Sequence, residues 1–434
     1  MVATLNDRAW EKVFSGLPVL EQVKKVGYFD ITASDLKKAA DREPRHLAKI
    51  DYESNRPSVF VENQLNVLAI TNSSYRIGNF NPFFKLPDWN LEAIKPVSLL
   101  PSANLETLST REISSENAVI YSAYSSSMIE HFCGEDVVPT VSGRMRTSKF
   151  SFSVDSYERK AQNIEVNGAQ IEIDAGFEGK ESFNIFEVKN SISSSFNLRQ
   201  VYYPFAMWRA AISKPVRNVF LTHSNNIFDF YEIDFLLDSN LSSASLVKHA
   251  RYTLGDNVPK KSEFEKALQE LSFISHSGAP FPQADDFDRV IDIVALLIEG
   301  PKTKNDLAEN YDFDPRQSDY YLNAARYLGL VESLDHSTYV PSELANVIYS
   351  KNAQEKNAFL MAILIKVPAV NELNKAWTTD GKKPSIDKAI QILKNLPDTP
   401  ALADSTIKRR AQTVVSWTSW LRNQLALSQI SEAS

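Results

Sequence analysis

Two carboxylates and a lysine lie close together on two consecutive segments that have the pattern of β-strands. Asp174 follows the alternating residues 169–173, and Glu187 and Lys189 end the apolar segment 183–189. Side chains two positions apart in a strand share a face, so Glu187 and Lys189 point the same way. A hairpin between the two strands would place Asp174 beside them.

Such a group of side chains suits hydrolysis of phosphodiesters. Neighbouring carboxylates repel each other, and burying them is costly unless a cation compensates their charge. Mg²⁺ takes oxygen ligands, typically one or two carboxylates with waters and phosphate oxygens. The ion polarises a phosphoryl oxygen and lowers the pKa of bound water. A lysine on the same face can orient the attacking water or stabilise charge that develops on the phosphate.

The bare pattern has a second interpretation, because E-x-K is short and occurs by chance. The alternative is a solvent-exposed hairpin face that carries an ordinary ion pair. Three observations favour the catalytic interpretation. The flanking IEI and FNIF residues are apolar enough for a central strand. The order of elements places both acids in the middle of a sheet. A helix with the polar side chains Arg199, Gln200 and Tyr203 follows directly.

The elements around the acids follow a definite order. Residues 109–132 have helical spacing, and Ser109 with Glu112 could form a capping box at the start. Strands are predicted at 148–156, at 169–177 after an Asn167-Gly168 turn, and at 183–189. A helix at 198–212 and strands at 216–223 and 227–235 come next. The order α-β-β-β-α-β, with one strand added, predicts a mixed α/β (α+β) sheet.

At this point the segment 109–240 resembles the PD-(D/E)xK nuclease superfamily, whose shared core is α-β-β-β-α-β. Asp174 matches the aspartate of that motif, and Glu187-Val188-Lys189 matches E-x-K, while Ile173 replaces the proline. Other segments, among them "REPRHLAKID", "QIEIDAGFEG" and "FDPRQSDYYLNAARYLGL", resemble bacterial type II restriction endonucleases that join this core to a C-terminal winged helix.

The resemblance implies a role for each matching residue. Asp174, Glu187 and the carbonyl of Val188 would bind Mg²⁺, and Lys189 would contact the scissile phosphate. The first helix of many relatives carries a further acid, for which we favour Glu116 over Glu130, although either could be a surface glutamate. On the helix after E-x-K, Arg199 and Gln200 are predicted to contact DNA. Glu172 and Glu178 either support the site or are merely exposed.

Two further groups of residues are predicted to bind DNA. Arg144, Arg146 and Lys149 are expected on a turn that leads into the first core strand, where basic side chains meet backbone phosphates. The third helix of the winged helix presents side chains suited to base edges in the major groove, namely Arg316, Gln317, Tyr320 and Asn323. The alternatives are a solvated basic turn and a winged helix that binds protein, since acidic residues lie next to its third helix.

Five regions are predicted along the chain. An N-terminal α+β region, a candidate for DNA recognition, spans 1–108, and the nuclease core spans 109–240. A helical linker at 241–285 precedes a winged helix at 286–350, which is expected from three helices followed by a hairpin. The remainder, 351–434, is helical. No internal repeat stands out.

Composition limits the class of protein. The chain has 434 residues with a net charge of −7, and one cysteine, so no disulfide framework is expected. No apolar run is long enough to cross a membrane. The negative charge argues against indiscriminate binding of polyanions. An intracellular location is therefore expected, and the resemblance to bacterial enzymes implies the bacterial cytoplasm.

The leading hypothesis is a Mg²⁺-dependent type II restriction endonuclease that cleaves double-stranded DNA at a specific sequence. Such an enzyme would work in phage defence, with a cognate methyltransferase in the same restriction–modification system. Because a duplex cut needs two active sites, a homodimer is expected. One alternative is a DNA repair or replication nuclease of the same superfamily. Another is a non-catalytic winged-helix regulator that binds DNA.

Overall fold

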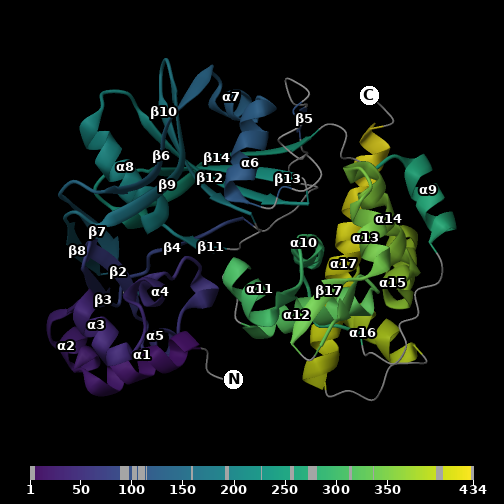
Figure 1. Ribbon diagram of the computed structural model, residues 1–434, viewed down its shortest axis with the longest axis horizontal. Helices are drawn as coiled ribbons and strands as arrows, with labels where there is room; N and C mark the ends of the chain where they lie inside the picture. The colour runs from purple at the N-terminus through teal and green to yellow at the C-terminus, as the bar shows by residue number, and fades with distance from the viewer. Residues whose placement is uncertain are drawn as a thin grey trace.

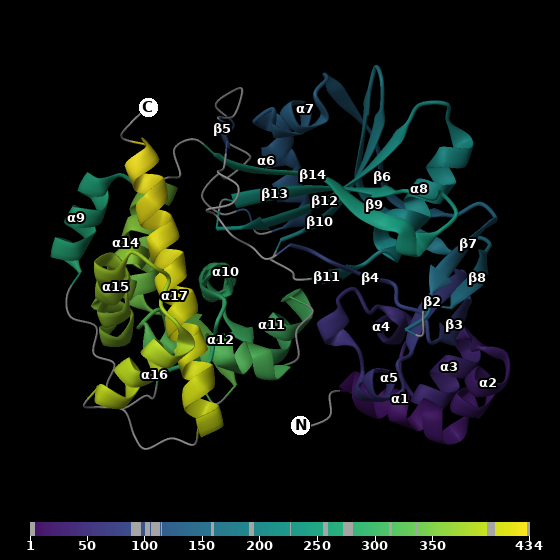
Figure 2. The same cartoon turned by 180° about the vertical axis from the view of Figure 1, so that it is seen from behind.

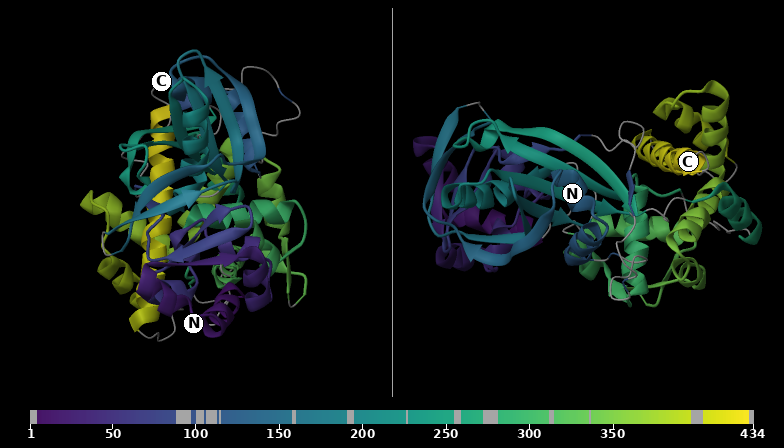
Figure 3. Two further views of the ribbon diagram at one scale, coloured as in Figure 1. Left: turned by 90° about the vertical axis from the view of Figure 1, so that its left-hand side faces the viewer. Right: turned by 90° about the horizontal axis from the view of Figure 1, so that it is seen from above.

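The computed structural model describes residues 5–87, 97–99, 105, 113, 115–157, 160–190, 195–225, 227–254, 259–271, 281–311, 315–335, 337–396 and 404–431. Side chains of residues 98, 308–311, 315–317, 404–405, 427 and 429–431 lie outside that description. The chain has the mixed α/β character that was predicted, with one mixed sheet and many helices. Figure 1 shows an N-terminal module and a large sheet on one side, and the C-terminal helices on the other. Figure 3 shows the same division from above.

The N-terminal module combines small helices with a three-stranded antiparallel sheet of order β1-β3-β2. Its core is built from side chains that are fully or almost fully buried, including Trp10, Leu36, Phe60 and Ile77. The elements are α1 (Leu5–Gly16), α2 (Val19–Val26), β1 (Tyr28–Thr32), α3 (Ala33–Ala40), α4 (Pro44–Ala48), α5 (Ser58–Glu62), β2 (Asn66–Thr71) and β3 (Ser74–Gly78).

A seven-stranded sheet of order β5-β14-β13-β12-β10-β9-β6 forms the centre of the molecule. Its strands are β5 (Val97–Leu99), β6 (Val137–Arg146), β9 (Gln170–Gly179), β10 (Phe183–Lys189), β12 (Val216–Ser224), β13 (Ile227–Phe235) and β14 (Ala244–Leu254). Strands β6, β9 and β10 are antiparallel neighbours, whereas β10 and β12 are parallel. Helix α8 (Arg199–Ala211) makes the crossover between β10 and β12. Figure 2 shows this sheet from behind.

Two apolar layers cover the two faces of this sheet. Side chains of α8 pack on one face with Ile185 and Phe220. Helices α6 (Glu116–Ser125) and α7 (Met128–Cys133) pack on the other face with Phe186 and Val188. The near-continuous burial of β10 follows from this double cover.

The helix predicted over 109–132 is in fact two helices. Ser127 adopts a left-handed conformation with φ 54° and separates α6 from α7. Helix α6 begins at Glu116, and its N-cap is Ser115, whose hydroxyl accepts the amide of Ala118. The predicted capping residues Ser109 and Glu112 lie outside the described residues. The helical spacing was right, but it does not reveal a break at two small polar residues.

Strand partners differ from the prediction at two places. The segment 148–156 is not the first core strand, because β7 (Phe150–Asp155) forms a separate two-stranded sheet with β8 (Ala161–Val166). Strand β6 takes the first place. The segment 241–285, expected to be a helical linker, contains the 11-residue strand β14, which pairs with β13. Alternation identifies a strand but not its partner, and β14 carries too many charged and polar residues to show alternation clearly.

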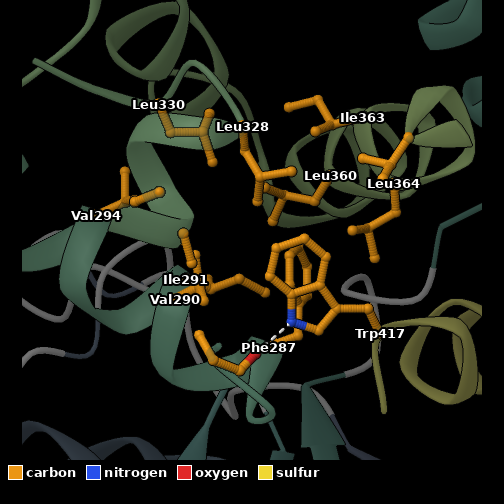
Figure 4. Close-up of a cluster of buried hydrophobic side chains, with 14 of the residues drawn as sticks. Phe287, Val290, Ile291, Val294, Leu328, Leu330, Leu360, Ile363, Leu364 and Trp417 are labelled. Carbon is orange, nitrogen blue, oxygen red and sulfur yellow. Dashed lines mark hydrogen bonds between the residues drawn. The ribbon is translucent and has the colours of Figure 1, made fainter. Parts of the chain in front are cut away.

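The C-terminal half begins with a helix, a short strand, two helices and a hairpin. These are α10 (Phe287–Ile298), β15 (Lys302–Thr303), α11 (Lys304–Tyr311), α12 (Pro315–Tyr327), β16 (Val331–Ser333) and β17 (Thr338–Pro341). The helices α13 (Glu343–Tyr349), α14 (Ala353–Lys366), α15 (Pro368–Asp380), α16 (Ile386–Asn395) and α17 (Asp404–Ser431) follow, and α9 (Lys261–Glu270) packs on α14. Figure 4 shows Trp417 of α17 among the buried side chains of α10 and α14.

No helix in the described ranges is long and apolar enough to cross a membrane.

Buried carboxylates of α10 lie where the sheet meets the C-terminal helices. Ser224, the last residue of β12, donates to Asp292 at 3.0 Å. One helical turn earlier, Asp288 accepts the indole N–H of Trp420 at 2.7 Å. Burial raises the pKa of Asp288 to about 7, and the neighbouring charge of Asp286 adds to this effect. Ionisation of Asp288 at this junction is therefore unfavourable in the folded protein.

Replacing Asp288 with asparagine should stabilise the protein at pH 8 and change stability little near pH 4. The carboxyl group has a pKa of about 7 in the folded protein, above its ordinary value of 3.8. Between these values the unfolded chain binds fewer protons, so the free energy of unfolding falls as pH rises. The full effect is on the order of 4 kcal/mol. Asparagine keeps an oxygen for Trp420 without the charge.

Urea denaturation at pH 4, 6 and 8 measures this effect, with Asp380→Asn on the exposed surface as the matched control. An Asp288→Asn variant with the same pH dependence as the parent protein would show that Asp288 does not titrate in this range.

Candidate active site

Asp174 lies at an irregularity in β9 that changes the direction of its side chains. Ile173 pairs with Gly143 and Gly176 pairs with Val141, so β9 has one residue more than β6 between these pairs. Accordingly, Ile173 packs with the α8 layer, whereas Ala175 packs with the α6–α7 layer. A β-bulge of this kind redirects a side chain and ends regular pairing. As a result, the side chain of Asp174 belongs to neither of the two apolar layers.

The partner strand β10 diverges from β9 at the same point. The last paired residues are Ala175 and Phe186. Beyond them, the Asp174 carboxylate takes the place of a backbone acceptor, because its Oδ2 accepts the amide of Val188 at 2.7 Å. This bond holds Asp174 against the E-x-K segment and satisfies one buried backbone donor.

Lys189 and Glu187 share a face of β10, as their spacing predicted. The ammonium of Lys189 donates to Glu187 Oε1 at 2.6 Å and to Glu116 Oε1 at 3.2 Å. The side chains of Lys189 and Glu187 are 13% and 10% exposed, whereas that of Glu116 is 44% exposed. Four charged groups from α6, β9 and β10 therefore meet at one end of the sheet, and Glu116 connects them to solvent.

Helix α8 contributes a fifth side chain to this cluster. Gln200 Nε2 donates to Glu187 Oε1 at 2.6 Å, while Gln200 Oε1 is buried without a hydrogen-bond partner. Gln200 was predicted to contact DNA, and the structure brings it to the carboxylate. Arg199, predicted to act with it, lies 3.9 Å from the buried carboxylate of Asp51.

The surroundings shift the pKa values of these groups in a consistent way. Burial raises the pKa of Glu187 to about 8, and the positive charge of Lys189 only partly offsets it. Burial likewise raises the pKa of Asp174 to about 6. Burial alone would lower the pKa of Lys189, but the negative charges of Glu187 and Glu116 outweigh it and raise that pKa. Lys189 is therefore a cation at neutral pH rather than a general base.

Sequence reasoning missed three residues around this cluster. Tyr52 lies close enough for its phenolate form to raise the pKa of Lys189, and the backbone carbonyl of its neighbour Asp51 accepts the backbone amide of Asn197 at 2.8 Å. Asn190, directly after E-x-K, accepts a hydrogen bond at Oδ1 from His223 Nδ1 at 2.8 Å. Its position next to Lys189 was a usable signal. Tyr52 had none, because only the tertiary fold brings the N-terminal module to this place.

The donor set is compatible with a divalent cation held by two carboxylates. Asp174 and Glu187 supply hard oxygen ligands, and the unpartnered Gln200 Oε1 is a further buried oxygen beside them. Within the described ranges, no three His, Cys, Asp or Glu side chains are grouped as a complete metal site. A cation here would need backbone or water oxygens in addition, as predicted for the carbonyl of Val188.

The remaining predicted residues lie away from the cluster. Glu130 is on α7, where burial raises its pKa, and the acid that reaches Lys189 from the helical layer is Glu116 instead. Glu172 is exposed and pairs with Arg144 at 3.3 Å. Glu178 pairs with Lys214 at 2.6 Å.

The basic residues predicted on a turn before the first core strand are placed differently. Arg144 and Arg146 lie within β6 itself, at the edge of the sheet. Lys149 follows β6 and pairs with Glu165 at 3.1 Å. The prediction of a turn was wrong because the first core strand begins at Val137. Contact with DNA stays a prediction for these three residues, which lie on the molecular surface with Arg144 and Lys149 partly neutralised by glutamates.

The third helix of the C-terminal module is α12, as predicted. Tyr320 and Asn323 are exposed on it. Arg316 and Gln317 belong to α12, but their side chains lie outside the described residues. Asp319 forms an ion pair with Lys304, so one of the acidic residues near this helix is neutralised.

Comparison with known proteins matches the chain to domains of unknown function. Three family models match the chain. Domain of unknown function (DUF6996) matches residues 7–77, Domain of unknown function (DUF6997) matches residues 78–253, and Domain of unknown function (DUF7226) matches residues 289–426. No curated protein matches the chain significantly, and no solved structure does. The middle range contains Glu116, Asp174, Glu187 and Lys189 together.

Proposed function

We propose that the protein is a Mg²⁺-dependent endonuclease that hydrolyses phosphodiester bonds of double-stranded DNA, acting as a type II restriction enzyme in the bacterial cytoplasm. The observation that carries this proposal is the meeting of Asp174, Glu187 and Lys189 at the end of adjacent strands. The strand arrangement supports it, because β6-β9-β10 form an antiparallel meander and β12 joins in parallel through α8. That is the order α-β-β-β-α-β of the PD-(D/E)xK core.

The part of the C-terminal half that spans α10 to β17 supports double-stranded DNA as the partner. Its order α10-β15-α11-α12-β16-β17, with a sheet of order β15-β17-β16, is that of a winged helix. Fold alone does not establish DNA binding. The polar exposed residues Tyr320 and Asn323 on α12 add a surface suited to base edges. In this proposal the enzyme acts as a homodimer beside a cognate methyltransferase.

The cluster assigns a task to each side chain. Asp174 and Glu187 hold Mg²⁺, which supplies Lewis-acid activation of the phosphate and a bound water of lowered pKa. Val188 fixes the orientation of Asp174 through its amide. Gln200 orients Glu187 through the bond to Oε1. Lys189, a cation at neutral pH, donates hydrogen bonds to the phosphate oxygen on which charge develops.

Lys189 must leave its present partners to do so. Its ammonium now occupies the space between Glu187 and Glu116. A cation bound by Glu187 would displace it electrostatically, because two positive charges repel strongly in a partly buried site. The half-exposed Glu116 gives the displaced ammonium a nearby carboxylate.

Plasmid cleavage tests the proposal directly. Incubation of the protein with supercoiled plasmid and MgCl₂ should give discrete linear fragments, and EDTA should abolish them. Run-off sequencing of the fragments then gives the site and the stagger. Smeared products or resection from ends would indicate a repair nuclease instead. Intact plasmid over a titration of Mg²⁺ and Mn²⁺, together with a retarded band in a gel, would overturn catalysis and favour a DNA-binding regulator.

A further inference from the structure

The N-terminal module has the same order of elements as the winged-helix part of the C-terminal half. After an initial helix, both have a strand, two helical segments and a hairpin: β1-α3-α4, then β2-β3, and β15-α11-α12, then β16-β17. Helix α5 interrupts the first series before β2. The sheets also agree, because β1-β3-β2 and β15-β17-β16 both place the last strand in the middle and are antiparallel throughout.

The correspondence extends to the sequence, which we did not expect. Residues 32–45 align with residues 303–316 without a gap. Six positions are identical, and one exchanges Glu43 for Asp314. The identical pairs are Thr32 and Thr303, Asp35 and Asp306, Leu36 and Leu307, Asp41 and Asp312, Pro44 and Pro315, and Arg45 and Arg316.

The shared residues have the same structural tasks in both modules. The Thr32 hydroxyl accepts the amide of Asp35 at 3.1 Å and donates to its carboxylate at 2.7 Å. Thr303 and Asp306 make the same two bonds at 3.2 and 2.8 Å. A polar pair of this kind caps a helix start and fixes its entry.

Behind each cap, a leucine packs into the core of its module. Leu36 and Leu307 are both fully buried. At the next helix, Pro44 and Pro315 each occupy the first position, where proline is favoured. The identities therefore fall on caps, core and helix starts, as expected if both segments fold alike.

Arg45 is the residue of the N-terminal module that aligns with Arg316. Each is the second residue of its helix, α4 for Arg45 and α12 for Arg316. Arg45 is exposed, and so is Lys38 on the preceding helix, whereas the neighbouring Lys37 forms an ion pair with Glu43. In a helix-turn-helix, the first residues of the second helix approach base edges while the first helix crosses the phosphate backbone. The position of Arg45 and the charge beside it match that geometry.

We propose that residues 28–78 form a second DNA-binding module, a repeat of residues 302–341, and that Arg45 contacts duplex DNA as the counterpart of Arg316. The proposal rests on the proposed function only in naming double-stranded DNA as the partner. In Figure 1 both modules lie below the seven-stranded sheet, with α4 and α11 on the sides that face each other. Two modules on one chain raise the effective concentration of the second contact once the first has formed.

Selection from a duplex pool with 40 randomised base pairs tests this. The full chain carries Asp174→Asn to prevent cleavage, and selected duplexes are sequenced. We expect two separate blocks of base preference in the selected pool. Arg45→Ala should erase or weaken one block, and Arg316→Ala the other. Each change should also lower affinity for a selected duplex about tenfold and reduce the slope of log affinity against log salt by about one if a phosphate contact is lost.

Arg8→Ala is the matched control, because Arg8 is an exposed arginine of the same module outside the repeat. Arg45→Glu should weaken binding more than Arg45→Ala, which separates a charge effect from altered folding, and circular dichroism checks the fold of each variant. If Arg45→Ala and Arg45→Glu bind duplex DNA like Arg8→Ala and with the same base preferences, the proposal of a second DNA-binding module is wrong, while the proposed function stands. If the parent protein retains no duplex from the pool, both proposals fail.

Discussion

Asp174→Asn is expected to abolish metal-dependent cleavage of plasmid while leaving the fold and duplex binding intact. Asparagine has nearly the same shape, and its oxygen can still accept the amide of Val188. What it loses is the negative charge. Asp174 and Glu187 are the two carboxylates that β9 and β10 bring together at this point, so replacing one with a neutral ligand should weaken cation binding strongly. We expect a loss in cleavage rate on the order of 10³-fold and a loss in Mg²⁺ affinity of at least about 100-fold.

Glu172→Gln provides the matched control for this variant. Glu172 lies two residues before Asp174 on the same strand, and it is exposed and paired with Arg144. An exposed pair of this kind contributes at most about 1 kcal/mol to stability, so Glu172→Gln should cleave like the parent protein. Rates come from single-turnover cleavage of plasmid, and Mg²⁺ affinity from isothermal titration calorimetry. Full cleavage by Asp174→Asn would remove Asp174 from the catalytic assignment.

The strand positions of the three motif residues could be predicted from the sequence because strand geometry is local. Glu187 and Lys189 share a face in any β-strand, and the structure confirms their contact at 2.6 Å. The position of Asp174 could not be predicted in the same way. Its approach to Val188 depends on an extra residue in β9 relative to β6. A bulge is a property of two paired strands, and the single-strand pattern "IEIDAGF" shows only alternation.

Long-range neighbours were the least predictable part. Tyr52 reaches the cluster because the N-terminal module docks on β11 (Ser195–Asn197) through backbone and side-chain bonds, such as Asn197 Nδ2 to the carbonyl of Ile50 at 2.9 Å. Composition carries no trace of such docking. The repeat of the N-terminal module was also missed, although it is visible in the sequence. Six identities over fourteen positions are weak evidence of a repeat by themselves. They become convincing because the helix caps and the strand orders of the two modules also agree.

The fold of the core shows why burial of the cluster matters for mechanism. Lys189 is surrounded by Glu187, Glu116 and Asp174, all of which stabilise its charge. A lysine held in this way serves as a hydrogen-bond donor and a positive charge at neutral pH. Deprotonation of the attacking water must then depend on other groups, and the Lewis acidity of a cation between Asp174 and Glu187 is suited to that task.

Lys189→Met should separate metal binding from catalysis, and it is the second variant with a large expected effect. Methionine fills a similar volume without charge. Cleavage should fall on the order of 10²- to 10³-fold, because the phosphate loses a charged donor. Affinity for Mg²⁺ should not fall, and we expect it to rise, because the ammonium that now competes for Glu187 and Glu116 is gone. A merely structural lysine would not produce this opposite pair of changes.

Lys214→Met is the matched control, since Lys214 is also a lysine paired with a glutamate of the sheet, Glu178, but away from the cluster. It should cleave and bind Mg²⁺ like the parent protein. Lys189→Arg keeps the charge with a planar head group that fits the pocket differently. It should therefore keep the stability of the fold but recover only part of the cleavage rate. If Lys189→Met loses cleavage and Mg²⁺ affinity together while circular dichroism shows an intact fold, then Lys189 acts by ordering the two carboxylates, and its contact with the phosphate is wrong.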